Sequence, residues 1–332
     1  KRQRLGHRRL EGVGLDGARD SWGRELWPGA EEAIERVAPD VLHAHFGRPG
    51  VKAVPIARQL DLPFVVTFYG YDISKLPRER RWREAYESIW RTAQAVVVLS
   101  EEMKEAAVRL GAPPDAVRVV HLARDLDDFP YRPPSAPVSE FISVGRLTGK
   151  KGHFDAIRAV QKRIEAGDDL QLYIVGDGPQ RDDLEQYIQA HNLQSSVELL
   201  GSIPNAEVAR RLQKADAFLL CSKTAASGDR EGTPTVLIEA QAVGLPCVST
   251  THAGIPEMIP ESNHSLLAPE GEVDDIAERL RRLRACSDEE LRGVSAAGRE
   301  IIETSFSLSS EAGAFREIYE RAVHDQEHAT AS

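Results

Sequence analysis

The chain has 332 residues, of which 41% are hydrophobic and 28% charged, as is typical of a globular protein with two domains of ordinary size. No apolar run is long enough to span a bilayer, which excludes a membrane-embedded bundle. The net charge of −10 is uneven, because residues 1–137 carry +2 and residues 138–332 carry −12, so nucleic acid is not an expected partner.

The start of the chain is basic, with five Lys or Arg among residues 1–10. We interpret these residues as solvated, and a lipid-facing patch is the alternative. The three cysteines follow no metal-ligand spacing, and Cys221 and Cys247 lie in apolar runs, as core thiols do in a reducing compartment. With no recognisable signal peptide, the sequence predicts a cytoplasmic protein, and the lipid-facing alternative would bring it to the inner face of the membrane.

The first half alternates strands and helices, which is typical of a parallel sheet. The predicted strands are 41–45, 63–68, 95–100 and 116–120. The predicted helices are 30–37, 51–60, 78–91 and one that begins at the segment S-E-E-M, with Ser100 as its cap.

Two residue clusters in the first half allow more than one interpretation. His43 and His45 share one face of a strand, but a metal site would need a third ligand and none is evident. Trp82, Tyr86 and Trp90 recur every four residues in a helix that carries five arginines. This pattern favours an aromatic core over an exposed face for an acceptor or a membrane.

Prolines concentrate between the two halves, which marks 121–137 as a linker. The second half then resumes the alternation. Its predicted strands are 140–144, 170–175, 197–200, 217–221, 245–250 and 264–268. Its predicted helices are 182–189, 205–214, 234–243, 273–286, 288–304 and 309–323.

The central stretch is residues 228–256, which read as loop, helix, strand and turn. Gly232 lets the backbone approach a ligand, Thr233 can cap the helix, and Pro234 suits its first turn. The N-terminus of a helix binds anions such as phosphate. Glu231 and Glu239, with seven residues between them, could hold hydroxyl groups on either side of that phosphate. In the alternative interpretation, Glu231 only caps the helix and Glu239 is a solvated side chain on its surface.

A second candidate segment is G-R-L-T-G-K-K-G at 145–152. Gly145 frees the backbone, and Arg146 and Lys151 bring two cations to one loop, as a diphosphate requires. The nearby segment G-D-G-P contains Gly178 but lacks the third glycine of a dinucleotide fingerprint, because Arg181 stands there.

These motifs together resemble a known family. E-G-T-P-T-V-L-I-E-A, followed by G-L-P-C-V-S-T and G-I-P-E, is similar to the E-x7-E signature of the retaining glycosyltransferases of family 4. G-R-L-T-G-K-K-G resembles their G-R-L…K-G motif, T-F-Y-G-Y-D resembles their H-G-x-D segment, and G-D-R-E-G looks like the branch of colanic acid and exopolysaccharide glycosyltransferases. The resemblance covers most of the chain.

The resemblance implies the α/β GT-B fold, with two Rossmann-like domains of parallel sheet facing each other across a cleft. Residues 1–137 would bind the acceptor, 138–305 would bind a nucleotide-sugar, and 306–332 would form a helix that crosses back to the first domain. The implied reaction is retaining transfer of a sugar from a nucleotide-diphosphate sugar to a hydroxyl of a glycan or polyprenyl-linked acceptor in surface polysaccharide synthesis. The sequence shows no cluster of metal ligands, and two cations at the diphosphate make a metal unnecessary, so no metal and no other cofactor is expected.

The resemblance also implies site residues. The catalytic group would comprise Glu231 beside the donor sugar, Asp72, and Tyr69 where the family usually has a histidine. A phenol can form hydrogen bonds but does not titrate near neutral pH, which puts a histidine-dependent mechanism in doubt. The residues expected at the donor are Gly145, Arg146, Lys151, Gly178, Ile203, Gly232, Thr233, Pro234, Thr235 and Glu239, with Glu239 at the ribose.

The family's first domain opens with a strand and a glycine-bearing loop, and no such segment precedes 30–37. We therefore expect a shortened N-terminus, with nucleotide binding retained and transfer slow or absent. Two alternatives remain: a nucleotide-sugar epimerase or phosphorylase of the same fold, and a non-catalytic protein that binds sugar nucleotides.

Overall fold

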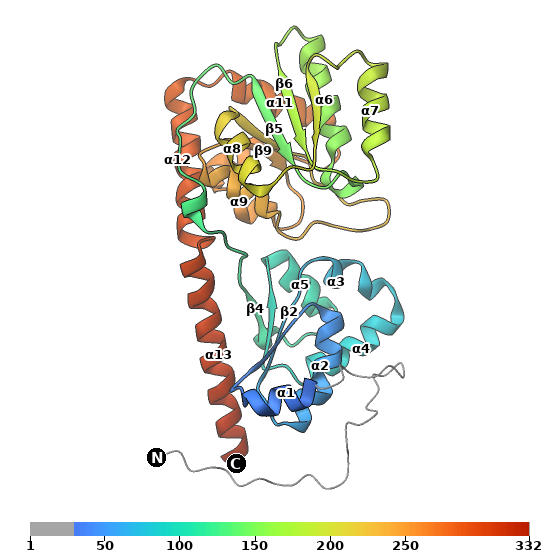
Figure 1. The fold of residues 1–332 in the computed structure, drawn as a ribbon, viewed down its shortest axis with the longest axis vertical. Coiled ribbons are helices and arrows are strands. Elements are labelled where there is room, and N and C mark those ends of the chain that lie inside the picture. Colours follow the sequence, from blue (N-terminus) through green and yellow to red (C-terminus); the bar gives the residue numbers. More distant parts are fainter. Residues whose placement is uncertain (1–29, 332) are drawn as a thin grey trace.

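The computed structural model describes residues 30–331, which form two β-sheets, one above the other in Figure 1. The first has four strands in the order β1-β2-β3-β4, and the second has six in the order β10-β9-β8-β5-β6-β7. All strand pairs in both sheets are parallel. Parallel neighbouring strands are joined by crossover connections, usually helices, which cover the sheet. The predicted alternation of strands and helices in a parallel sheet is therefore confirmed. The basic residues 1–10 lie outside the described residues.

The first sheet is built from short apolar strands and the helices between them. The strands are β1 (Leu42–His45), β2 (Phe64–Thr67), β3 (Ala95–Val98) and β4 (Val117–Val119). The helices are α1 (Ala30–Val37), α2 (Gly47–Gln59), α3 (Tyr71–Ser74), α4 (Arg80–Trp90) and α5 (Glu101–Arg109). The side chain of Ser100 accepts a hydrogen bond from the Met103 N–H, which confirms the predicted cap of α5.

One face of the first sheet carries the connecting helices. Its strands follow the chain order, so right-handed crossovers bring α2, α4 and α5 to the same side. Alternate residues of β2 and β3 pack there with Trp82, Tyr86 and Trp90 of α4. These three side chains are buried, so the predicted aromatic core is confirmed.

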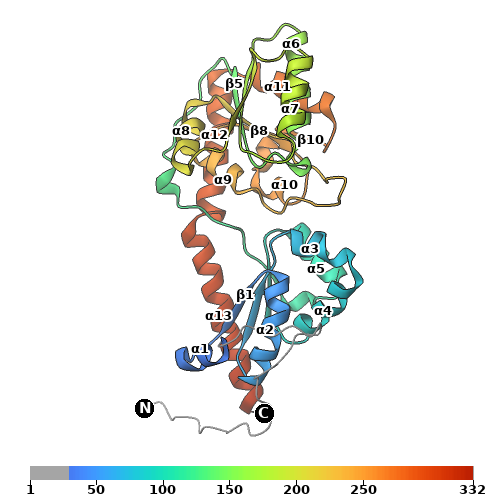
Figure 2. The same cartoon turned by 45° about the vertical axis from the view of Figure 1, so that its right-hand side comes forward.

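The opposite face of the first sheet is covered by the last helix, α13 (Leu308–Ala331). Val65, Ala95 and Val97 pack there against Ile318 and Ala322. Figures 1 and 2 show α13 running from the second sheet past the first. The end of the chain therefore completes the core around the first sheet.

The second sheet is longer and lies between two layers of helices. Its strands are β5 (Glu140–Val144), β6 (Gln171–Val175), β7 (Val197–Gly201), β8 (Ala217–Leu220), β9 (Cys247–Thr250) and β10 (Leu267–Ala268). Its helices are α6 (His153–Glu165), α7 (Arg181–Ala190), α8 (Asn205–Lys214), α9 (Thr235–Ala242), α10 (Ile255–Met258), α11 (Val273–Arg284) and α12 (Asp288–Ser305). Helix α6 was not predicted from the sequence.

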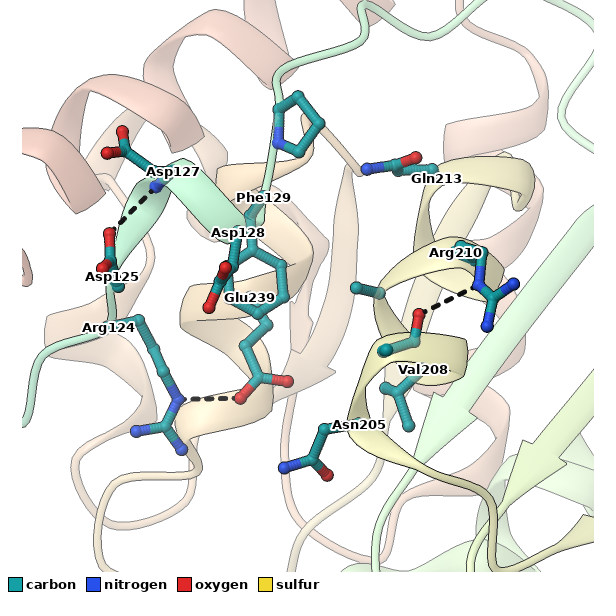
Figure 3. Close-up of a pocket in the computed structure, with 13 residues that line it drawn as sticks. Arg124, Asp125, Asp127, Asp128, Phe129, Asn205, Val208, Arg210, Gln213 and Glu239 are labelled. Carbon is teal, nitrogen blue, oxygen red and sulfur yellow. Dashed lines mark hydrogen bonds and ion pairs between the residues drawn. The ribbon is translucent and has the colours of Figure 1, made fainter.

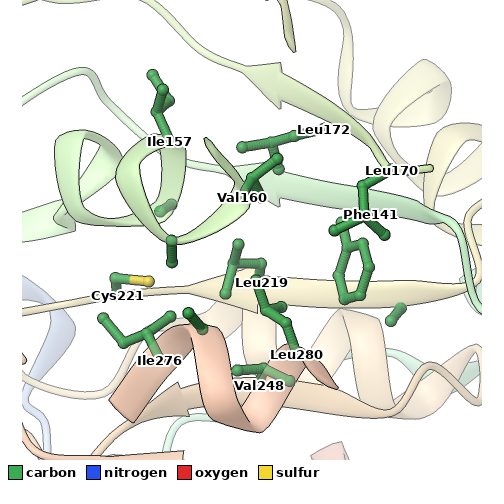
Figure 4. Close-up of a cluster of buried hydrophobic side chains, with 14 of the residues drawn as sticks. Phe141, Ile157, Val160, Leu170, Leu172, Leu219, Cys221, Val248, Ile276 and Leu280 are labelled. Atoms are coloured by element: carbon green, nitrogen blue, oxygen red, sulfur yellow. The ribbon is translucent and has the colours of Figure 1, made fainter. Parts of the chain in front are cut away.

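The two faces of the second sheet have separate cores. Figure 4 shows Ile157 and Val160 of α6 and Ile276 and Leu280 of α11 around the buried strand residue Leu219. Residues of α8, α9 and α12 form the other core. The predicted core thiols Cys221 and Cys247 are buried and unpaired, and burial raises the pKa of each.

Some predicted boundaries are wrong. Only Leu267–Ala268 of the predicted strand 264–268 is a strand, because the turn-forming residues Glu261–Leu266 adopt a 3₁₀ helix. The last helix extends beyond 309–323 to Ala331, since the sequence after Val323 carries no apolar period that would predict a helix. Helix α2 begins at Gly47, before the predicted residue 51.

We expect that Ile318→Ala destabilises the first sheet by about 2–4 kcal/mol, because it leaves a cavity between α13 and β2. All four tryptophans lie before residue 91, so their fluorescence during urea unfolding reports on this part of the chain. The matched control is Glu317→Ala, whose side chain is exposed one position earlier. An unchanged transition midpoint in the Ile318 variant would show that α13 does not support this core.

Candidate active site

The second sheet changes direction between β5 and β8, which are neighbours although three helices separate them in the chain. Ligands of open parallel sheets bind outside the carboxyl ends of the strands at such a reversal. Loop 145–152 follows β5, and loop 221–234 follows β8. The two motifs predicted to bind the donor therefore flank one crevice.

Close backbone packing explains the glycines of these loops. A β-carbon on Gly178 would lie 2.6 Å from the carbonyl oxygen of Leu147. A β-carbon on Gly152, whose φ is +66°, would lie 1.7 Å from the carbonyl oxygen of Cys221. The loop after β5 thus rests directly on the segments that follow β6 and β8. The N–H of Gly145 donates to the Val175 carbonyl at 2.9 Å and fixes the start of this loop.

Helix α9 begins at the crevice with no side-chain cap. The predicted cap, Thr233, is wrong: Pro234 has the extended backbone of the N-cap position, and the buried Thr233 hydroxyl has no hydrogen-bond partner among the described residues. The buried hydroxyls of Thr148 and Ser222, on the adjoining loops, also have no hydrogen-bond partner among the described residues. Uncapped helix N–H groups and unsatisfied buried hydroxyls are features of a site that binds an anionic or hydroxylated ligand.

Glu231 forms an ion pair with Lys151, one of the two cations predicted to bind the diphosphate. Its Oε2 lies 2.5 Å from Nζ of Lys151, and Lys150 Nζ lies 4.0 Å from its Oε1. Burial raises the pKa of Glu231, but the two lysines outweigh burial and hold the pKa below its ordinary value. Glu231 is therefore an ionised hydrogen-bond acceptor near neutral pH.

His252 and Glu270 hold the backbone of Glu231, and neither residue was predicted from the sequence. The Glu231 N–H donates to Nε2 of His252 at 3.2 Å, and Nδ1 of His252 donates to the Glu270 carboxylate. Burial lowers the pKa of His252 more than Glu270 raises it, so the ring is neutral with its proton on Nδ1. The only signal in the sequence was the position of His252 just before G-I-P-E.

The Tyr69–Asp72 loop of the first sheet faces this site. A β-carbon on Gly70 would lie 3.3 Å from Cα of Gly232, so the two loops nearly touch. The Tyr69 hydroxyl forms a 2.5 Å hydrogen bond with Nδ1 of His45. Asp72 is 2% exposed, and its two oxygens accept the Gly47 and Tyr69 N–H groups at 2.9 and 2.8 Å. Asp72 therefore fixes the loop and is not open to a substrate.

Polar contacts also join the two sides of the crevice. Arg230 Nη1 lies 2.7 Å from Oε1 of Glu102 on α5. The carboxylate of Glu257 accepts the N–H groups of Glu101 and Glu102 at the start of α5, at 2.9 and 3.4 Å. A carboxylate at a helix N-terminus is stabilised by the free N–H groups and the helix dipole.

Glu239 opens onto a pocket of about 780 Å³ between the linker and α8, shown in Figure 3. Apart from Thr235, one turn earlier, it is the only residue of α9 that is not buried. Its Oε1 accepts a hydrogen bond from Nε of Arg124 at 2.8 Å. Arg124 was not predicted from the sequence, because the prolines of 121–137 indicate only a linker.

The residues predicted at the diphosphate lie in the loops that flank the crevice, whereas Glu239 lines the pocket between the linker and α8. Not all of the predicted residues make the expected contacts. Arg146 is exposed and pairs with no described residue, whereas Lys151 is engaged by Glu231. Ile203 follows β7 and packs partly buried on the core around α8 and α9. His43 bonds Tyr319 and Thr67, and no group of three potential metal ligands occurs within residues 30–331. No helix in this range is both long and apolar enough to cross a membrane.

Asp72 generates a prediction about pH. Burial raises its pKa from 3.8 to about 6, although backbone N–H groups act in the opposite direction. The folded chain thus holds this proton more tightly than the unfolded chain, so the contribution of Asp72 to stability is largest below pH 3.8 and is lost as the pH rises through about 6. The stability advantage of the parent over Asp72→Asn should fall by about 2–3 kcal/mol between pH 4 and pH 7, measured by urea unfolding. Asp115→Asn, at an exposed position, is the control, and a pH-independent difference for Asp72→Asn would contradict the prediction.

Comparison with protein families matches both halves of the chain. The model described as "Glycosyl transferases group 1" matches residues 135–300, and the model described as "Glycosyltransferase Family 4" matches residues 2–128.

Similar proteins and structures agree with these matches. The putative colanic acid biosynthesis glycosyltransferase WcaL of Escherichia coli K12 is 36% identical over 81% of this chain and 67% of its own length. The amylovoran biosynthesis glycosyltransferase AmsK of Erwinia amylovora is 33% identical over 93% of this chain and 76% of its own. The crystal structure of Anabaena HepE in complex with UDP has a TM-score of 0.76 and 19% identity over 92% of this chain and 85% of that one, which supports the GT-B fold. The chain therefore belongs to the glycosyltransferases of family 4.

Proposed function

We propose that this enzyme transfers a sugar, with retention of configuration, from a nucleoside diphosphate sugar to a hydroxyl of a glycan or lipid-linked acceptor. The observation that carries the proposal is the meeting of loop 145–152, the start of α9 and the Tyr69–Asp72 loop at one crevice. Two of these segments bring cations and free N–H groups suited to a diphosphate. The third comes from the other sheet, where an acceptor would approach.

The donor nucleotide would lie along the second sheet. The diphosphate would accept hydrogen bonds from the start of α9 and would be neutralised by Arg146 and Lys151, with Gly145, Gly178 and Gly232 giving the backbone access. The base would border Ile203, and the ribose hydroxyls would donate to Glu239. The solved HepE structures contain UDP, glucose and UDP-glucose, which makes a uridine nucleotide the first donor to test here.

Transfer would depend on charge stabilisation more than on a protein base. Glu231 is held ionised by Lys151, so it suits the hydroxyl groups of the donor sugar as a hydrogen-bond acceptor. The acceptor oxygen would bond to the anomeric carbon on the face from which the diphosphate departs. The acceptor proton would pass to the leaving phosphate oxygen. Arg146, Lys151 and the N–H groups near Thr233, Pro234 and Thr235 would stabilise the charge that forms there.

The acceptor would lie on the first sheet's side of the crevice. Tyr69 has a hydroxyl at the crevice, paired with His45, that can bind an acceptor or sugar hydroxyl. Asp72 would act indirectly by holding the Tyr69 loop. Because WcaL and AmsK are named for colanic acid and amylovoran biosynthesis, we propose a saccharide acceptor in exopolysaccharide assembly. A polyprenyl-linked acceptor would bring the first half against the inner face of a membrane.

Donor choice can be tested by a thermal-shift panel of UDP, GDP, ADP and dTDP. A ligand that binds only the folded chain at 100 times its Kd stabilises it by about 2.7 kcal/mol. The sugar nucleotide of the selected base is then incubated with and without a saccharide acceptor. Transfer that depends on the acceptor and retains the configuration of the sugar would support the proposal. Conversion of the donor without an acceptor would indicate an epimerase, and a folded chain that no nucleotide stabilises would overturn the proposal.

We expect Glu239→Ala to weaken binding of the selected nucleoside diphosphate by about 1.5–3 kcal/mol, roughly tenfold to a hundredfold, because the ribose loses a charged acceptor. Isothermal titration calorimetry measures the change. The matched control is Glu207→Ala on α8, whose partly buried carboxylate pairs with Arg210 and Arg211 of the same helix. An unchanged Kd would reject the ribose role of Glu239.

The two cations should behave differently when each is changed to alanine. Arg146→Ala should weaken diphosphate binding and leave the unliganded melting temperature unchanged, since Arg146 is exposed and unpaired among the described residues. Lys151→Ala should weaken binding and also lower stability by about 1–3 kcal/mol, because it leaves the Glu231 charge buried without its closest partner. Adding Glu231→Gln to Lys151→Ala should restore stability but not affinity. Equal melting temperatures for all variants would contradict the Lys151–Glu231 pairing.

A further inference from the structure

Arg124 lies where the two connections between the sheets meet. It follows β4 in the segment that leads from the first sheet to the second. Its N–H donates to the Phe306 carbonyl at 3.1 Å, and it forms a parallel bridge with Ser307, just before α13 begins. The backbone of Arg124 is therefore fixed by both chain crossings.

The side chain of Arg124 extends from this junction to α9. Its Nε donates to Oε1 of Glu239 at 2.8 Å, and its Nη2 donates to the Thr235 hydroxyl at 2.6 Å. Thr235 and Glu239 stand one turn apart and are the only residues of α9 that are not buried. The planar guanidinium thus spans the whole exposed face of the helix, a contact that a lysine ammonium cannot make at both points.

This contact leaves part of the Glu239 carboxylate free. Arg124 occupies Oε1, and Figure 3 shows the second oxygen turned away from Arg124, on the side of the pocket formed by α8. The same pocket is lined by Asp125, Asp127 and Asp128, so without Arg124 the Glu239 carboxylate would face like charges and could turn among several rotamers.

We propose that Arg124 is a positioning residue for Glu239: it fixes the carboxylate of Glu239 so that its free oxygen can accept the ribose hydroxyls of the donor. The inference rests on the proposed function, because it requires Glu239 to bind ribose. It adds that the ribose site is set by the junction of the two chain crossings and not by α9 alone. Since the donor's hydroxyls need only the remaining lone pairs of the carboxylate, Arg124 stays in place when the nucleotide binds.

The test compares the nucleoside diphosphate selected by the thermal-shift panel with its 2′-deoxy and 3′-deoxy forms. The variants are Arg124→Met, Arg124→Lys, Glu239→Ala and the double variant Arg124→Met/Glu239→Ala. Arg132→Met is the matched control, because Arg132 lies in the same segment but donates to the Gln213 carbonyl. Calorimetry gives the Kd, and the unliganded melting temperature reports any effect on folding.

Arg124→Met should raise the Kd of the ribose nucleotide about tenfold, and Arg124→Lys should recover only part of the loss. The loss of affinity caused by Arg124→Met should be smaller for at least one deoxy nucleotide. It should vanish in the Glu239→Ala background, since a positioning residue has no effect once the residue that it positions is absent. Arg132→Met should leave the Kd unchanged. A general folding defect would instead weaken all three nucleotides equally.

Two results would overturn this inference by itself. Tighter binding by Arg124→Met would mean that Arg124 blocks Glu239. An unchanged Kd in Arg124→Met, while Glu239→Ala weakens binding, would mean that Glu239 needs no positioning, and the proposed function would stand. If Glu239→Ala itself leaves the Kd unchanged, or if no nucleotide binds, the ribose assignment fails and this inference fails with it.

Discussion

Parallel connections between strands are right-handed, and this constraint decides where each layer of the molecule lies. In the first sheet the strand order follows the chain, so the crossovers fill one face and leave the other bare. Helix α13, from the far end of the chain, has to cover that bare face. In the second sheet the order reverses after β7, so helices cover both faces and a crevice opens between β5 and β8.

Each acid of the E-x7-E stretch is held by a cation from a different part of the chain. Lys151 reaches Glu231 from the loop after β5, and Arg124 reaches Glu239 from the segment between the sheets. A carboxylate that is largely withdrawn from water needs such a partner to stay charged. The pairs therefore fix both acids in the unliganded chain.

The two halves are joined by contacts of different strength. On one side α13 buries Ile318 and Ala322 in the core of the first sheet, which is a firm apolar attachment. Across the crevice the Arg230–Glu102 pair is about one-third exposed, and contacts of this kind contribute little net stability. The apolar attachment along α13 is therefore firmer than this ion pair.

The sequence by itself determined the local structure and the class of chemistry. Strand and helix periods are local, so most elements were predicted close to their observed bounds, and the spacing of Glu231 and Glu239 marked the start of α9. Only the tertiary structure decided which residues meet: that Asp72 is buried, that His252 and Glu270 hold Glu231, and that Arg124 holds Glu239. Arg124 and Glu239 are far apart in the chain and share no period, so no local pattern could pair them. Their contact exists because the linker, the start of α13 and the exposed face of α9 converge in space.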